Sequence, residues 1–339
     1  MIAQIVSRLT ANPFVPHAAL KNGHLQTIAA ALIPRRIKLV DKIKEARIFE
    51  PEPGIKVLVY CHWQPDRKSR PTVVIVHGME GSADSCYMLG TAEKAVASGF
   101  NTIRVNIRNC GGTESMCPTL YHAGMTEDVR HIITELAETD GLRNIYLVGF
   151  SLGGNMVLKL AGEYGASLPN ALKGVAAISP SIDLTSAINA IEQRSNLLYH
   201  WRFVRSLRTR LKRKASFFPD RYDPSLLSGI WSIRKFDDAY TAPHCGFADS
   251  GDYYRRASAL PYISRITVPT VIIHAKDDPF IPYAPLERAE VAQNPNVLLL
   301  APDCGGHVGF VSARRNGLDQ FWAEVKAVEF VSVLAARRA

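Results

Sequence analysis

The segment Gly149-Phe150-Ser151-Leu152-Gly153-Gly154 has the clearest potential for chemistry. It follows an apolar run, Asn144 to Val148, and precedes a stretch of helical character, which would place Ser151 on a sharp strand-to-helix turn. Small neighbours let a strand and a helix approach there, and the helix N-terminus favours negative charge that develops during acyl transfer. This context predicts Ser151 as a catalytic nucleophile. The alternative is a glycine-rich β–α turn with an incidental serine, because the G-x-S-x-G pattern also recurs by chance.

A nucleophilic serine needs a base to take its proton and an acid to orient that base. Behind a turn of this type they follow in the chain order Ser, Asp or Glu, His. The apolar run Thr270 to Ala275 is typical of a buried strand, and it leads into a loop with Asp277 and Asp278. We predict Asp278 as the acid because its Asp-Pro-x-x-Pro setting resembles the acid loop of such enzymes, and Asp277 remains the alternative. His307 is the only one of the ten histidines beyond this loop, so the order predicts it as the base.

Acyl transfer also needs two backbone N–H groups that hold the oxyanion of the tetrahedral intermediate. One is expected from Leu152, the residue after the nucleophile, and the other from the loop that follows an earlier strand. The run Pro71 to Val76 is that strand, and His77-Gly78-Met79 begins its loop. We therefore predict the amides of Met79 and Leu152 as the oxyanion hole, with His77 bracing the loop.

Further motifs are spread along the chain. They are Asn12-Pro13-Phe14, His24-Leu25-Gln26-Thr27, His77-Gly78-Met79-Glu80-Gly81-Ser82, Arg108-Asn109-Cys110-Gly111-Gly112-Thr113, Phe236-Asp237 and Gly305-Gly306-His307-Val308-Gly309-Phe310. With the serine turn, they resemble the YheT-like branch of the α/β-hydrolases over nearly the whole chain. This resemblance implies an esterase with Ser151, Asp277 or Asp278, and His307 as its triad. It also implies relatives that act on phospholipids, acylglycerols or medium-chain ethyl esters, without settling the substrate.

Strand and helix patterns alternate along the chain and predict an α/β-hydrolase fold, with a mostly parallel central sheet flanked by helices. Residues 1–70 form an N-terminal arm with the opening antiparallel strands, and residues 71–183 and 264–339 form the core. The interval 184–263 is too long for a simple connection and predicts a helical cap insertion. Its aromatic residues are candidates for an acyl pocket or for cap packing: Trp201, Phe203, Phe217, Phe218, Tyr222, Trp231, Phe236 and Tyr240.

The composition of the 339 residues is that of an ordinary globular enzyme, with 47% apolar and 21% charged residues. No membrane-spanning run and no secretory signal are evident, which predicts a cytoplasmic protein. The six cysteines form no C-x-x-C pair or zinc-type spacing, and no phosphate-binding glycine motif occurs. The chemistry described above requires no metal and no organic cofactor.

Seven of the sixteen residues from 200 to 215 are basic and explain much of the net charge of +9: Arg202, Arg205, Arg208, Arg210, Lys212, Arg213 and Lys214. Such a helix suits either a solvated face or a weak association with an anionic membrane surface. No nucleic-acid motif accompanies the charge, so nucleic-acid binding is not expected.

Together these patterns predict a serine hydrolase that cleaves small or lipid-like carboxylic esters through an acyl-enzyme. An acyltransferase or a thioesterase with the same triad is the first alternative. The second is a catalytically silent binding module on the same scaffold.

Overall fold

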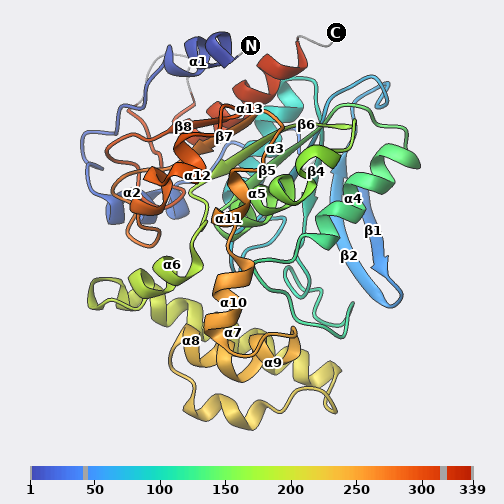
Figure 1. The fold of residues 1–339 in the computed structure, drawn as a ribbon, viewed down its shortest axis with the longest axis vertical. Coiled ribbons are helices and arrows are strands. Elements are labelled where there is room, and N and C mark those ends of the chain that lie inside the picture. Colours follow the sequence, from blue (N-terminus) through green and yellow to red (C-terminus); the bar gives the residue numbers. More distant parts are fainter. Residues whose placement is uncertain (1, 41–44, 314–318, 337–339) are drawn as a thin grey trace.

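An eight-stranded sheet forms the centre of the protein (Figure 1), in the order β1-β2-β4-β3-β5-β6-β7-β8. The computed structural model describes residues 2–40, 45–313 and 319–336, and of residues 2–5 only the backbone. The strands are β1 (Glu45–Glu52), β2 (Ile55–His62), β3 (Thr72–Val76), β4 (Asn101–Val105), β5 (Ile145–Phe150), β6 (Leu172–Ile178), β7 (Thr270–Ile273) and β8 (Val297–Leu300). β1 pairs with β2 and β2 with β4 in antiparallel fashion, and the other pairs are parallel. The predicted fold class is confirmed.

The inner strands read as continuous apolar runs because both faces of the sheet are covered. Along β3, Val73 and Ile75 pack into one core, while Val74 and Val76 pack into the other. All four side chains are fully buried. A parallel sheet covered on both faces exposes its functional residues only at its edges and strand ends, so the site is expected at the carboxyl ends of the strands.

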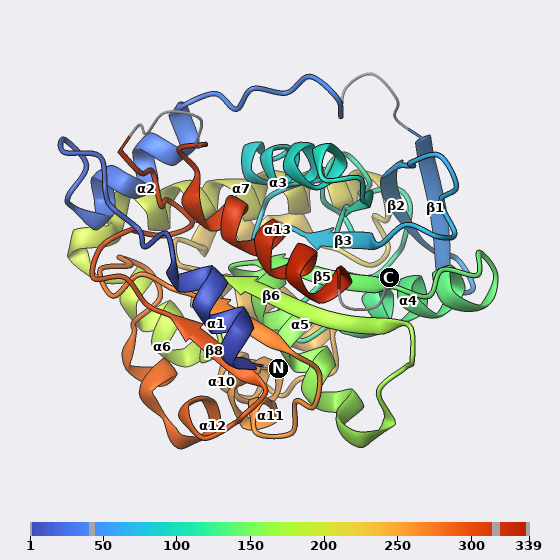
Figure 2. The same cartoon turned by 90° about the horizontal axis from the view of Figure 1, so that it is seen from above.

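Helices make up most of the remaining chain. They are α1 (Ile2–Thr10), α2 (Gly23–Leu32), α3 (Cys86–Ala97), α4 (Glu127–Glu138), α5 (Leu152–Tyr164), α6 (Leu184–Ile191), α7 (Leu197–Phe217), α8 (Ile233–Phe236), α9 (Ala242–His244), α10 (Ser250–Ala257), α11 (Leu260–Ile263), α12 (Ala289–Ala292) and α13 (Trp322–Ala335). α3 and α13 contribute side chains to the core of one sheet face, and α4 and α5 to that of the other (Figure 2). Within the described residues, no helix has the length and apolar character that crossing a membrane requires.

Residues 184–263, here called the helical segment, contain helices and turns but no strand. In Figure 1 the segment extends below the sheet, at the end of the molecule opposite the two termini. The buried side chain of Asn155 on α5 ties it to the core. Its amide donates to the carbonyl of Ala257 (2.8 Å), and its oxygen accepts the N–H of Ala259 (2.8 Å). The base of the helical segment is thus bonded directly to the helix that follows Ser151.

Candidate active site

Ser151 lies on the turn between β5 and α5, as the sequence predicts, with backbone angles of φ 51° and ψ −117°. This conformation is strained for any residue with a side chain, and such strain gathers at functional sites. The neighbouring glycines are required by close packing. A Cβ on Gly149 would collide with the carbonyl of Gly153, and one on Gly153 would collide with the carbonyl of His77. A larger residue at Gly149 would push α5 away from β5, one at Gly153 would push it away from β3, and either would misplace the serine.

The side chains of Ser151, His307 and Asp278 form one hydrogen-bonded series. The Oγ of Ser151 lies 2.9 Å from Nε2 of His307, and Nδ1 of His307 lies 2.8 Å from Oδ2 of Asp278. The side chain of Asp278 is fully enclosed, and that of His307 is 11% exposed. In this arrangement the serine hydroxyl donates to Nε2, and the N–H at Nδ1 donates to the carboxylate. The histidine is held in the tautomer that can accept the serine proton.

Asp278 and Asp277 have different surroundings, although they are adjacent in the sequence. Burial alone raises the pKa of Asp278, but the charge of His307 and its hydrogen bond bring that pKa below the usual range. The backbone N–H groups of Phe280 (2.9 Å) and Ile281 (3.0 Å) also donate to its Oδ1. Asp277 instead accepts the N–H of Gly306 at 2.8 Å, and burial raises its pKa. Asp278 therefore faces the imidazole, and Asp277 holds the backbone of the histidine loop.

The loop that carries His307 is held from three sides. The hydroxyl of Thr27 on α2 accepts the N–H of His307 at 2.8 Å, and Ser179 accepts that of Val308 at 3.1 Å. Gln26, also on α2, is fully buried. Its Oε1 accepts the N–H of Val311 at 2.7 Å, and its Nε2 donates to the carbonyl of Val311 at 3.1 Å. Gln26 and Thr27 belong to the motif His24-Leu25-Gln26-Thr27, to which the sequence alone assigns no role. These contacts show that the N-terminal arm supports the histidine loop.

The loop after β3 lies directly against the nucleophile. A Cβ placed on Gly78 would be 3.1 Å from Cβ of Ser151, and Met79 lines the cavities beside the serine. His77 braces this loop, as expected: its Nδ1 donates to the carbonyl of Gly78 (2.7 Å), and its Nε2 accepts the N–H of Ile107 (3.1 Å). Burial lowers the pKa of His77 to about 4, so the ring is neutral at pH 7. It has a structural role and is not placed to transfer a proton to Ser151.

Glu80 connects the same loop to the helical segment. Its carboxylate accepts the hydroxyls of Ser206 (2.7 Å) and Tyr121 (3.0 Å) and pairs with Nη2 of Arg210 (2.8 Å). The backbone of Glu80 is in the left-handed region, at φ 57°. The sequence offered no signal for this role beyond the position of Glu80 directly after Met79. The carboxylate fixes the distance between α7 and the residue expected to hold the oxyanion.

The basic residues of α7 do not share one solvated face. Arg210 points inward to Glu80, and Lys214 is fully buried, with its ammonium donating to Asn109 (2.5 Å) and to the carbonyls of Glu114 (3.0 Å) and Cys117. Burial lowers the pKa of Lys214 to about 8. Ser206, Arg210 and Lys214 repeat every four residues, which places them on one side of the helix. The remaining exposed basic residues of α7 are Arg202, Arg205, Lys212 and Arg213.

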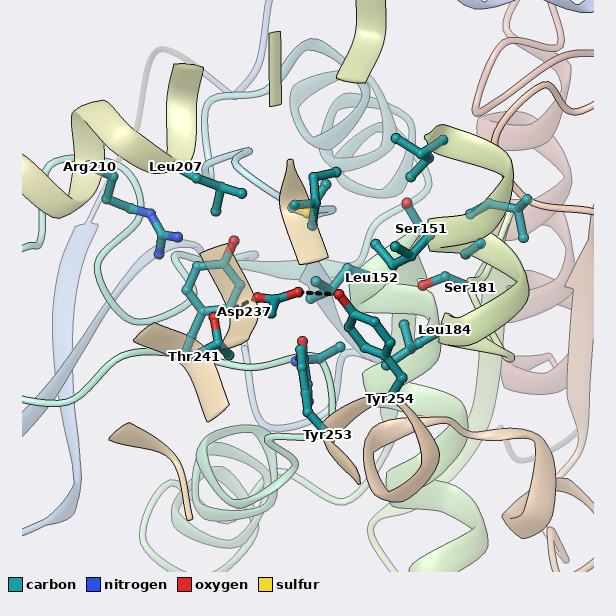
Figure 3. A pocket seen from close by; sticks show the side chains of 18 residues that line it. Ser151, Leu152, Ser181, Leu184, Leu207, Arg210, Asp237, Thr241, Tyr253 and Tyr254 are labelled. Carbon is teal, nitrogen blue, oxygen red and sulfur yellow. Dashed lines mark hydrogen bonds between the residues drawn. The ribbon is translucent and has the colours of Figure 1, made fainter. Parts of the chain in front are cut away.

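Two cavities meet at Ser151. The first, here called the enclosed pocket, lies between the serine and the helical segment (Figure 3). The second, here called the open groove, runs past His307 between α2 and α7. A substrate that spans the serine can thus place one part in each cavity.

Of the two alternatives for the eight aromatic residues, packing applies to several of them: Tyr222, Phe236 and Tyr240 are buried in the core, and Phe203 and Phe218 pack against it. None of the eight lines the enclosed pocket, and Phe203 lines the open groove. The aromatic residues of the enclosed pocket are Tyr121, Tyr253 and Tyr254. Sequence alone does not indicate which side of a cap helix faces inward, and this side decides which residues line the pocket.

Comparison with known proteins decides the family. The model of the alpha/beta hydrolase fold matches residues 71–313. The chain is an α/β-hydrolase. It is 32% identical over 321 residues to "Putative esterase YheT" of Escherichia coli, covering 94% of this chain and 93% of that protein. The resemblance expected from the motifs is confirmed.

Other relatives match a smaller share of their own length. "Monoacylglycerol lipase" of Saccharomyces cerevisiae is 28% identical over 75% of this chain and 59% of that protein. "Phospholipase ABHD3" of Mus musculus is 27% identical over 73% of this chain and 60% of that protein. Among solved structures, the Pyrococcus furiosus esterase Pf2001 aligns with a TM-score of 0.56 at 16% identity, covering 89% of this chain and 98% of that one. At such identity the structural match shows the fold alone.

Proposed function

We propose that this protein is a serine hydrolase that cleaves carboxylic esters through an acyl-enzyme. The observation that carries the proposal is the hydrogen-bonded series of Ser151, His307 and Asp278 on a strained turn in front of a helix N-terminus. Nucleophile, base and orienting acid are mutually in reach, which is the geometric requirement for this chemistry. The esterase and lipase names of the relatives agree with it.

In the first step, Oγ of Ser151 attacks the ester carbonyl carbon while its proton passes to Nε2 of His307. Asp278 stabilises the imidazolium through the bond to Nδ1. The amides of Met79 and Leu152 hold the oxyanion, and loss of one such donor costs about 3 kcal/mol of transition-state stabilisation. The intermediate collapses as His307 protonates the leaving alcohol, and the acyl group stays on Ser151.

In the second step, water takes the place of the alcohol. His307 removes its proton, and the resulting oxygen attacks the acyl carbon of the acyl-enzyme. Collapse returns the proton to Ser151 and releases the carboxylic acid. The enclosed pocket suits the acyl part of the substrate because it lies between Ser151 and the helical segment. The open groove suits the leaving alcohol, which must depart before water enters.

Exposed apolar side chains on the two helices that border the open groove favour lipid-like substrates. Leu25, Ile28 and Leu32 on α2 are 45–76% exposed, and Leu197 and Leu198 on α7 are 54% and 83% exposed, although none of the five lines the groove itself. His24 on α2 stacks on Tyr199 of α7, with ring centroids 5.7 Å apart, so the two helices are in direct contact. Exposed apolar side chains around a site are typical of contact with lipid. The names of the lipase and phospholipase relatives agree with this substrate class.

The test is hydrolysis of p-nitrophenyl esters of increasing acyl length by wild type and Ser151→Ala. We expect turnover by the wild type and loss of about 10⁶-fold in kcat in the variant, because the triad acts as a unit. Formation of ethyl esters when ethanol is added would reveal acyl transfer. Faster hydrolysis of thioesters than of esters with the same acyl group would reveal a thioesterase. Absence of turnover with every ester and thioester, in folded wild type, would contradict the proposal and favour a silent binding module.

We also propose a weak association of α7 with anionic membranes. Exposed Arg202 and Arg205 adjoin exposed Trp201 on this helix, a combination of charged and apolar residues that suits a membrane interface. Cosedimentation with phosphatidylserine vesicles should exceed that with phosphatidylcholine vesicles and fall in Arg202→Gln/Arg205→Gln. The exposed Lys56 on β2 provides the control variant Lys56→Gln. Equal recovery with both kinds of vesicle would contradict the association.

A further inference from the structure

The enclosed pocket is apolar beside Ser151 and polar at its far end. Aliphatic side chains make up much of its wall: Leu152, Leu184, Ala187, Ile188, Ile191, Leu207 and Ile233. Figure 3 shows Ser151 and Ser181 on one side, and Asp237, Thr241 and Arg210 toward the other. A pocket for a plain alkyl chain has no need of charged groups in its wall, and burying them without partners is costly.

Asp237 is the unusual group in this wall. It is 7% exposed, and its carboxylate accepts the hydroxyls of Thr241 (2.6 Å) and Tyr254 (2.7 Å). Among the described residues the carboxylate of Asp237 forms no ion pair. Burial raises its pKa to about 6, which is still below 7, so the group is largely ionised at pH 7. A carboxylate can accept about four hydrogen bonds, so Asp237 has capacity for a further donor.

Arg210 determines the charge balance at this end. Its Nη2 pairs with Glu80 at 2.8 Å, and the guanidinium lies over the ring of Tyr121, 4.4 Å from the centroid. Its Nε and Nη1 are buried and have no partner among the described residues. Arg210 and Glu80 neutralise each other, so Asp237 leaves this end of the pocket with a net negative charge.

The charges and hydrogen-bonding groups of Asp237 and Arg210 discriminate between chemical groups at the distal end of the acyl chain. A carboxylate at the end of the chain would be repelled by Asp237 and has no proton to donate to it. An ammonium group could donate to Asp237, but it offers no acceptor to the unpaired Nε and Nη1 of Arg210. A plain alkyl end would desolvate Asp237 and return no hydrogen bond. A hydroxyl can donate to the carboxylate of Asp237 and has lone pairs for a donor such as Arg210, which makes it the group that this end accommodates best.

We infer that the enclosed pocket selects esters whose acyl chain bears a hydroxyl in its distal part, with Asp237 as the acceptor. The inference rests on the proposed function, because it assumes that the acyl group occupies this pocket. Asp237 touches the substrate in this account and sets specificity, while the bond-breaking steps remain with Ser151 and His307.

The experiment compares p-nitrophenyl esters of straight-chain acids with hydroxylated esters of the same length, moving the hydroxyl along the chain. Wild type should give a kcat/KM about 10-fold higher for one hydroxyl position than for the plain ester, as one hydrogen bond to a charged group provides. Asp237→Leu should invert that ratio, and Asp237→Asn, the conservative variant, should reduce it several-fold. Equal rates for all esters in wild type, or an unchanged ratio in both variants, would overturn the inference.

A binding measurement separates this inference from the proposed function. Ser151→Ala cannot form an acyl-enzyme, so the thermal shift it shows with intact hydroxylated and plain esters reports the pocket alone. A larger shift with the hydroxylated ester supports the selection even if no ester is hydrolysed. Hydrolysis of plain and hydroxylated esters at equal rates, with equal thermal shifts, would leave the esterase function standing and reject the hydroxyl site.

Discussion

Glu80 joins α7 to the loop of the expected oxyanion hole, and replacing it should affect stability and activity together. Its side chain is 7% exposed and that of Arg210 is 11% exposed, so this ion pair is buried. Glu80→Ala leaves Arg210 without a counter-charge, with Nε and Nη1 already lacking partners. Breaking a buried pair by removing one partner costs about 3–5 kcal/mol. We expect a loss of that size in the free energy of unfolding, and a lower kcat because Met79 precedes Glu80 directly.

A double-mutant cycle isolates the contribution of the pair. Arg210→Met removes the charge that would be left unpaired, so Glu80→Ala/Arg210→Met should be less destabilised than the sum of the single variants, by about 2 kcal/mol. Urea unfolding at pH 7 measures the stability, and the rate of fluorophosphonate labelling of Ser151 measures the site.

The matched control is Arg213, which lies on the same helix. It pairs with Glu114 at 3.7 Å, but its side chain is 66% exposed. Arg213→Met should change the free energy of unfolding by less than about 1 kcal/mol, as is usual for an exposed pair. If the costs of the Glu80 and Arg210 variants simply add, or if Arg210→Met costs no more than Arg213→Met, the reasoning is refuted.

Three further predictions concern the acid, the histidine loop and pH. Asp278→Asn should lower kcat by about 10⁴-fold through the wrong imidazole tautomer, whereas Asp277→Asn should lose about 10-fold or less; equal losses in steady-state assays would contradict the assignment. Thr27→Val removes the acceptor for the N–H of His307 and should lower kcat more than it raises KM, so a change in KM alone would contradict it. Burial raises the pKa of Asp237 to about 6, against about 3.9 unfolded. With respect to this group the protein is therefore most stable below pH 4 and loses about 3 kcal/mol as the pH rises through 6. The stability of Asp237→Asn relative to wild type should therefore grow between pH 4 and 6, and a constant difference in urea unfolding would refute this.

The candidate nucleophile and the candidate base could be proposed from the sequence because local patterns mark both. A glycine-flanked serine between a strand and a helix has few structural solutions, and parallel strands bring their carboxyl ends to one edge. The choice between Asp277 and Asp278 depends on which of two successive side chains turns toward the imidazole. The motif resemblance favoured Asp278, and the structure places its carboxylate 2.8 Å from His307.

Other parts of the site had no local signal. Thr27 and His307 are 280 positions apart, and only the folded chain shows that they touch. The basic run of α7 suggested a solvated face, yet Arg210 and Lys214 turn inward because the carboxylate of Glu80 and backbone carbonyls satisfy them there. Patterns of charge describe what a helix carries, whereas tertiary packing decides which of its residues become buried.

Mass spectrometry after treatment with a fluorophosphonate shows whether Ser151 is an activated nucleophile. We expect one adduct per chain, on the peptide that contains Ser151, in wild type. We expect no adduct in Ser151→Ala and strongly slowed labelling in His307→Ala. An adduct on another residue, or equally fast labelling of the His307 variant, would show that Ser151 is not activated by His307.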